Sequence, residues 1–227
     1  MKKINSLLFI ALMSLIFGCA PARFVEPLNK NEWSIGGNFG GPLLDLNAPI
    51  PIPLSAVEIG YGLDSNLTVF GAVHTTAALF GNVQMDGGVT YQFIEQDKYL
   101  PNISTSPSFN FIYNFENGTG KVWPIIDLNA WWNYGKRKSY FYVGVNNYFE
   151  LSAMNADEQP IRQHWILNPQ FGHLLKDKRE RWQFTSEIKW LSPVNDNSYA
   201  FVPYNTLGTR GALGFYVGFR WILGKKN

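Results

Sequence analysis

The sequence predicts an all-β fold, an antiparallel up-and-down β-barrel of about ten strands. From Trp33 onward, apolar and polar residues alternate with the period of a strand that has two different faces. The alternation recurs in about ten segments, and bacterial single-chain membrane barrels have an even number of strands. The apolar faces of the segments contain, in order, Ile35, Ile59, Val69, Val89, Phe111, Ala130, Val145, Leu167, Ile188 and Val217.

The two faces of these segments differ in a way that favours a membrane barrel. The polar face is rich in Asn, Gln, Thr and Gly, whereas a soluble surface usually carries Lys and Glu. In this register no Asp, Glu, Lys or Arg falls on the apolar face. Tryptophans lie near the ends of segments, where membrane barrels carry an interfacial aromatic girdle. These tryptophans are Trp33, Trp132, Trp165, Trp182, Trp190 and Trp221.

Composition narrows the classes of function. Charged residues make up 16% of the chain, against about 25% in typical soluble domains. The formal net charge of +2 is too small to indicate a nucleic-acid partner. After the first twenty residues or so the sequence has no long apolar run, so we expect no transmembrane helix in the mature chain. We expect membrane lipid as a partner and leave a second envelope protein open.

The N-terminus has the pattern of a secretory signal over residues 1–18. Lys2 and Lys3 precede an apolar run that is too short to span a bilayer, and the run ends at Gly18 and Cys19. The stretch 16–19, Ile-Phe-Gly-Cys, resembles the lipobox of bacterial lipoproteins. The resemblance implies cleavage before Cys19 and acylation of that residue, with palmitate among the chains. The alternative is an incidental cysteine beside an ordinary cleavage site.

Cys19 is the only cysteine, so no intramolecular disulfide can form. We divide the rest of the chain into a lipidated tether (19–32), a barrel (33–223) and a short polar tail (224–227). The mature chain as a whole resembles outer-membrane β-barrel proteins, although no subfamily is identified. The resemblance implies that the chain lies in the outer membrane, where the lipid on Cys19 also holds it.

Connection lengths predict the orientation. The turns at 64–66, 135–138 and 176–181 are short, whereas the alternate connections include the long ones. Short turns usually face the periplasm, which places both ends of the mature chain on that side. The connection at 94–106 departs from this pattern, because it is long and falls among the short turns.

Charged residues on the polar face are expected to project into the barrel as an interior network. In an open pore they would tune ion selectivity, and in a filled barrel they would pair with one another; we favour the filled barrel because a barrel of this size has little free room. The predicted network consists of Glu58, His74, Asp86, Asp127, Glu150, Glu187, Lys189 and Arg220.

The sequence carries no glycine-rich phosphate loop, Cys/His metal pattern or nucleophile elbow. The least poor candidate for a barrel-borne lipid hydrolase is His74, next to Thr75 and Thr76, and its structural interpretation is an interior histidine bonded to neighbours. We therefore predict no catalytic residue, no metal and no cofactor other than the covalent lipid on Cys19.

Two functions from different classes remain open. The first is a non-enzymatic outer-membrane barrel with a structural, docking or narrow-passage role. The second is a soluble lipocalin-like lipoprotein that binds an apolar ligand. The membrane barrel requires the aromatic face to point outward, and the lipocalin-like barrel requires it to point inward.

Overall fold

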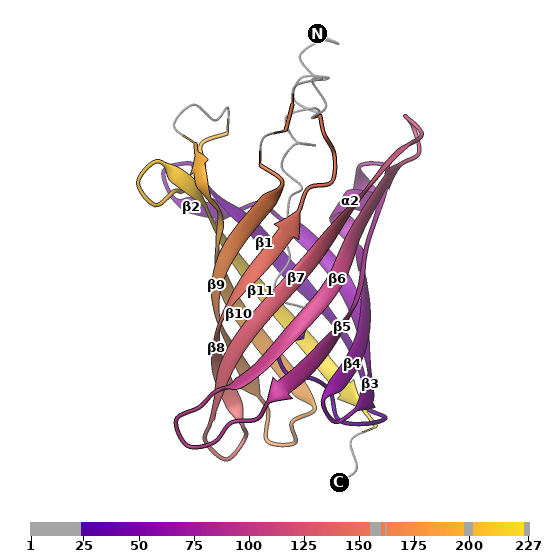
Figure 1. Cartoon of the computed structure of the whole chain (residues 1–227), viewed down its shortest axis with the longest axis vertical. Helices are drawn as coiled ribbons and strands as arrows, with labels where there is room; N and C mark the ends of the chain where they lie inside the picture. Colours follow the sequence, from indigo (N-terminus) through magenta and orange to yellow (C-terminus); the bar gives the residue numbers. More distant parts are fainter. Residues whose placement is uncertain (1–23, 155–159, 162, 198–201, 225–227) are drawn as a thin grey trace.

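The computed structural model describes residues 24–154, 160–161, 163–197 and 202–224, and the predicted signal and Cys19 lie outside these ranges. The described residues form one tilted barrel (Figure 1). A short strand, β2 (Pro49–Pro51), and one helix, α2 (Thr75–Leu79), lie in connections. The barrel strands are β1 (Trp33–Asp45), β3 (Leu54–Asp64), β4 (Leu67–His74), β5 (Asn82–Ile94), β6 (Asn102–Asn114), β7 (Thr119–Tyr134), β8 (Ser139–Phe149), β9 (Trp165–Lys176), β10 (Trp182–Asp196) and β11 (Arg210–Leu223).

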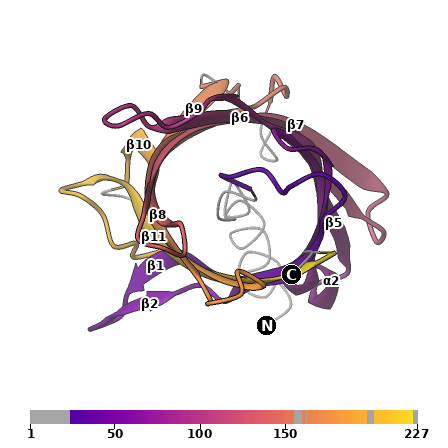
Figure 2. The ribbon, with the colours of Figure 1, turned by 90° about the horizontal axis from the view of Figure 1, so that it is seen from below.

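The sheet closes on itself. Each barrel strand pairs antiparallel with its neighbours in the chain, and β11 returns to pair with β1 from Trp33↔Leu223 to Pro42↔Gly214. Viewed along its axis the sheet is a complete ring (Figure 2). Closure leaves no unpaired strand edge in the ring. The predicted ten-stranded antiparallel barrel is therefore confirmed, and β2, which pairs with the extension of β1, stands outside the ring.

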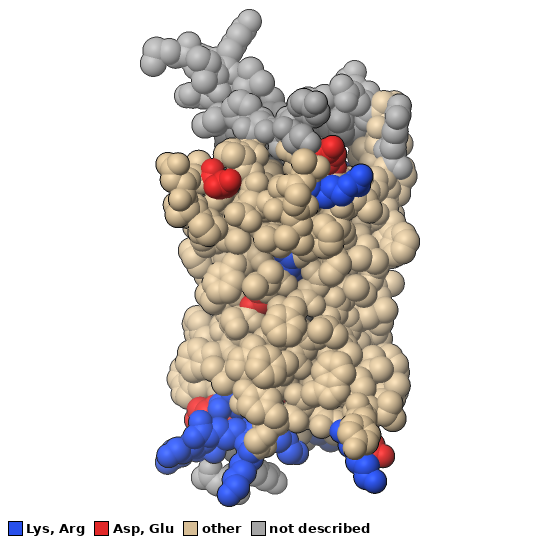
Figure 3. Space-filling view, turned by 90° about the vertical axis from the view of Figure 1, so that its left-hand side faces the viewer, with Lys and Arg blue, Asp and Glu red and all other residues tan. Residues whose placement is uncertain are grey.

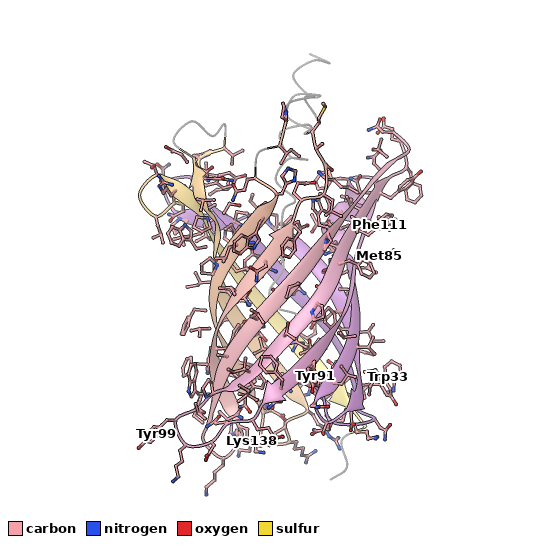
Figure 4. All side chains as sticks on the ribbon, viewed as in Figure 1. Trp33, Met85, Tyr91, Tyr99, Phe111 and Lys138 are labelled. Atoms are coloured by element: carbon pink, nitrogen blue, oxygen red, sulfur yellow. The ribbon has the colours of Figure 1, made fainter. Side chains whose placement is uncertain are left out.

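The apolar face of the wall points outward. Ile59, Phe141 and Ile188 are each between 46% and 49% exposed, although they lie inside strands. The intervening residues face the lumen and are buried, as Glu58 and Glu187 are. Met85 and Phe111 project away from the barrel in Figure 4, and Figure 3 shows charged side chains gathered at the two ends of the wall. The lipocalin-like alternative is wrong in this respect, because its aromatic face would line the interior.

The two ends of the barrel differ in their connections. We call the end with the turns at 65–66, 135–138 and 177–181 the short-turn end; it is the lower end in Figure 1. The connection expected at 94–106 also lies here, but β6 begins at Asn102, so the connection is only residues 95–101. The opposite, long-loop end carries α2 and the connection between β10 and β11. The described residues contain no helix long and apolar enough to span a membrane.

Residues 24–32, which we call the luminal segment, enter the barrel. Figure 2 shows this indigo segment inside the ring. Phe24, Val25 and Leu28 are 1%, 3% and 5% exposed, so the wall surrounds them. This part of the predicted 19–32 tether is thus not an extended linker outside the barrel. Its apolar side chains are buried in the lumen, an environment that an external tether would not offer them.

Candidate functional site

The polar lumen and the luminal segment form the candidate site. Because the luminal segment is not a strand of the sheet, its backbone groups need partners from side chains. Thr90 Oγ1 donates to the carbonyl of Phe24 at 3.0 Å, and Ser104 Oγ donates to that of Val25 at 2.7 Å. The amide of Leu28 donates to Thr68 Oγ1 at 2.7 Å. Hydroxyls from β4, β5 and β6 therefore fix the segment to the wall.

Phe24 is held on one side of the lumen. Its ring lies 5.8 Å from that of Phe70, and the guanidinium of Arg220 stands 4.1 Å above its centroid. Gly60 provides the space for this ring, since a Cβ there would lie 2.4 Å from Phe24 Cζ. Gly62 is needed for the same reason, because a Cβ there would meet the carbonyl oxygen of Asn29 at 2.0 Å. The glycines of β3 thus leave room for the segment.

Val25 and Glu26 contact the other side of the lumen. Glu26 Oε2 forms an ion pair with Lys176 Nζ at 2.6 Å, and the Lys176 side chain is only 6% exposed. Removing either partner would leave the other charged in a largely buried place, which is costly. Val25 belongs to a buried cluster with Trp131, Tyr140, Tyr142 and Leu174.

The eight residues of the predicted interior network all face the lumen or its rim. Arg220 Nε donates to Glu58 Oε1 at 2.5 Å, and Asn38 Nδ2 donates to the other carboxylate oxygen at 3.4 Å. The pair joins β3 to β11 across β1, the strand at which the barrel closes. These two charges are therefore paired with each other on the wall, as expected for a filled barrel, rather than left to line an open pore.

A second ionic group lies on β8 and β10. Tyr142 donates its hydroxyl to Glu187 Oε2 at 2.7 Å, and Lys189 Nζ lies 3.5 Å from Glu187 Oε1. The same ammonium stands 5.9 Å from the ring centroid of Tyr216. Glu187 and Lys189 are each 1% exposed, so their charges compensate each other where little water can.

Amides carry the network around the rest of the wall. His74 Nε2 lies 3.0 Å from Asp86 Oδ2, and Asn110 donates to the other oxygen of Asp86. On the other side, Asn146 Nδ2 donates to Asp127 Oδ1 at 2.6 Å, and Asn168 donates to Asn146 at 3.0 Å. Asn is therefore frequent on the inward face because it donates to one strand neighbour and accepts from another.

Glu150 lies at the long-loop end, just beyond β8. It accepts from Lys121 Nζ at 2.7 Å, from Trp123 Nε1 at 2.8 Å and from the amide of Ser152 at 2.7 Å. Burial would raise the pKa of the carboxyl, but these donors outweigh burial and hold the pKa of Glu150 below its ordinary value.

The hydrolase candidate does not come together. His74 belongs to the inward register, whereas the hydroxyls of Thr75 and Thr76 bond with Ser55 Oγ at 2.7 and 2.9 Å. Ser55 alternates with inward-facing Ala56 and so lies on the other side of the wall from His74. The structure therefore forms no pair of nucleophile and base from these residues. Among the described residues no cluster of His, Cys, Asp and Glu could hold a metal ion.

Sequence reasoning missed the apolar content of the lumen. Seven aromatic residues alternate with the outward-facing set and so share the inward register with Asn and Glu. Their alternation with outward residues such as Phe141 and Val143 was a usable signal that the lumen is filled. These inward aromatic residues are Phe70, Trp123, Trp131, Tyr140, Tyr142, Tyr148 and Tyr216.

The fold and lumen define a closed ten-stranded antiparallel barrel with an apolar exterior and an occupied polar interior. Searches of protein families and of curated protein sequences each found no match. Among solved structures, the barrel is similar to the outer membrane protein OprG from Pseudomonas aeruginosa, with 14% identity, a TM-score of 0.34, and coverage of 88% of this chain and 100% of that one. A bacterial polysaccharide outer membrane secretin gives 9% identity, a TM-score of 0.32, and coverage of 87% and 99%.

Proposed function

We propose that the protein is a lipid-anchored outer-membrane β-barrel, without enzymatic activity, that serves as a closed structural or docking body. The outward-facing apolar wall carries this proposal. Val69, Val143 and Phe215 are between 38% and 44% exposed inside strands. A continuous apolar wall of this kind is unfavourable in water and favourable in hydrocarbon. Aromatic side chains at the strand ends, such as Trp33 and Trp182, complete the pattern of a membrane barrel.

The occupied lumen favours a closed body over an open pore. Apolar side chains of the luminal segment pack among inward aromatic residues, and its charged residue Glu26 is paired with Lys176. Charges on the wall are paired across neighbouring strands, as in Glu58 and Arg220. An aqueous pathway through the lumen would require the segment to move.

The lipid on Cys19 is the second part of the proposal. Phe24 follows Cys19 by five positions, so their Cα atoms lie within about 18 Å of each other. An acylated Cys19 would thus be held close to the barrel. With short turns on the periplasmic side, we propose that both ends of the mature chain lie there and that the lipid enters the same membrane.

The decisive experiment measures which side chains touch acyl chains. Single cysteines at positions 69, 111, 143 and 215, in a Cys19→Ser background, carry a spin label in reconstituted bilayers. The collision rate of the spin label with lipid-soluble oxygen should be high at these four positions. It should be low at the inward positions 110 and 146, whose asparagines are 4% and 5% exposed. Equally low collision rates at all six positions would exclude a lipid-facing wall.

A further inference from the structure

Two adjacent hairpin turns at the short-turn end carry an excess of positive charge. The turn between β7 and β8 contains Lys136, Arg137 and Lys138, and the turn between β9 and β10 contains Lys178 and Arg179 flanked by Asp177 and Glu180, so positive charge remains in excess. The five Lys and Arg side chains are all exposed. None of the five forms an ion pair with any residue that the structure describes. We call these two segments the basic turns.

The basic turns lie side by side. Strands β8 and β9 pair with each other, and the amide of Lys176 donates to Ser139 Oγ at 3.1 Å where the two strands meet the turns. Like charges on neighbouring turns repel one another and attract anions, and these two turns are joined to a single pair of hydrogen-bonded strands. The surface is therefore complementary to an anionic partner.

Aromatic rings on the outer wall stand directly beside the basic turns. Tyr134 ends β7, and its ring stacks on Phe141 at 5.4 Å; Phe141 in turn stacks on His173 at 4.2 Å and on Phe171 at 6.2 Å. The Tyr134 hydroxyl lies 2.5 Å from His173 Nε2, which fixes the two polar tips at the rim. We call these four residues the aromatic platform. Rings with an apolar body and a polar tip suit the boundary between headgroups and acyl chains.

The long-loop end has no comparable surface among its described residues. Its cations there are Lys121, which is paired with Glu150 at 2.7 Å, and Arg210, which donates to the carbonyl of Val194 at 3.2 Å. In Figure 3 most of the blue side chains accordingly lie at the lower end, below a wall on which few charged atoms are visible. The positive charge is thus concentrated at one end of the barrel.

We propose that the basic turns and the aromatic platform together form a binding surface for anionic phospholipid headgroups. The cations would contact the phosphates, and the platform would contact the upper acyl chains of the same lipid. The inference rests on the proposed membrane location. We assign phospholipid because the short turns are expected to face the periplasm, where the outer membrane presents its phospholipid leaflet.

The test compares two lipid probes on the full chain. The protein is reconstituted in phosphatidylcholine bilayers with a trace of spin-labelled phosphatidylglycerol or spin-labelled phosphatidylcholine, and the immobilised fraction gives their relative association. A basic residue near an anionic membrane surface contributes about 1 kcal/mol, so we expect phosphatidylglycerol to be preferred at least about threefold. The preference should fall when salt shortens the Debye length to about 3 Å.

A matched pair of variants locates the surface. Lys178→Gln with Arg179→Gln should reduce the preference at least about twofold. Lys30→Gln with Arg210→Gln removes the same charge away from the basic turns, beside the β3–β4 turn and at the long-loop end, and should leave the preference unchanged; Lys30 already lies 3.7 Å from Asp64. Equal losses in both variants, or no preference in the unmodified protein, would overturn this inference while immobilised phosphatidylcholine still supported membrane insertion. If neither lipid is immobilised, the proposed membrane location fails, and this inference fails with it.

Discussion

Removing the side chains that hold the luminal segment should open the barrel. The variant carries Phe24→Ser, Val25→Ser, Glu26→Ser and Leu28→Ser, so the chain length is unchanged. Full burial of an apolar side chain contributes about 1.5–3 kcal/mol, which gives roughly 5–9 kcal/mol for the three buried residues as an upper estimate. The variant also leaves Lys176 without its partner Glu26. We expect the segment to leave the lumen.

The geometry of the ring predicts what would remain. Strands about 4.8 Å apart and tilted by about 40° give ten strands a backbone radius of about 10 Å, and inward side chains reaching about 5 Å leave a bore about 10 Å wide. A single extended chain with its side chains is also about 10 Å thick. Withdrawal of the segment should therefore leave a passage for water and small ions.

Planar-bilayer conductance is the measurement. The unmodified protein should show little or no conductance, and the fourfold variant should show a steady ohmic current. The control replaces three residues of the long-loop end with serine: Leu46, Ile50 and Leu79, which are 51%, 49% and 84% exposed. This control should behave like the unmodified protein. A folded variant that stays closed would refute the role of the segment. A large ohmic current through the unmodified protein would refute the filled barrel.

Three further outcomes follow from the same structure. Cys19→Ser should abolish incorporation of a palmitate analogue, and label retained by the variant would contradict lipidation. Val143→Arg should lower the free energy of unfolding in bilayers by about 2–4 kcal/mol, whereas Tyr134→Arg, on the same face at the rim, should cost about 0–1 kcal/mol; equal costs would contradict a lipid-facing wall. Because the pKa of Glu150 is lowered in the folded state, its stabilising effect is present above the unfolded pKa and is lost as pH falls through the folded one. Glu150→Gln should therefore lower the thermal midpoint more at neutral pH than under strongly acidic conditions, and a loss independent of pH would contradict the ionic origin.

The wall could be predicted from the sequence, and the luminal segment could not. A strand between lipid and a polar lumen must alternate apolar and polar residues. The two-residue period therefore predicts that Ile59 faces outward and Glu58 faces the lumen. The luminal segment has no period, and its partners lie far away in the chain. The hydroxyls of Thr68 and Ser104 bond to backbone groups 40 and 79 residues away, and nothing local to Leu28 or Val25 indicates such contacts. Composition alone made this stretch look like a tether.

The luminal segment and the closure of the barrel depend on the same side chain. Arg220 lies on the last strand, and its partner Glu58 lies 162 residues earlier on β3, beyond the strand with which β11 pairs. The same guanidinium stands over the ring of Phe24. The ring is also held from β4 by Phe70, and the adjoining carbonyl is held from β5 by Thr90. The full binding place for Phe24 therefore exists only after β11 has joined β1, so the segment fits the closed ring and stabilises closure by binding to it.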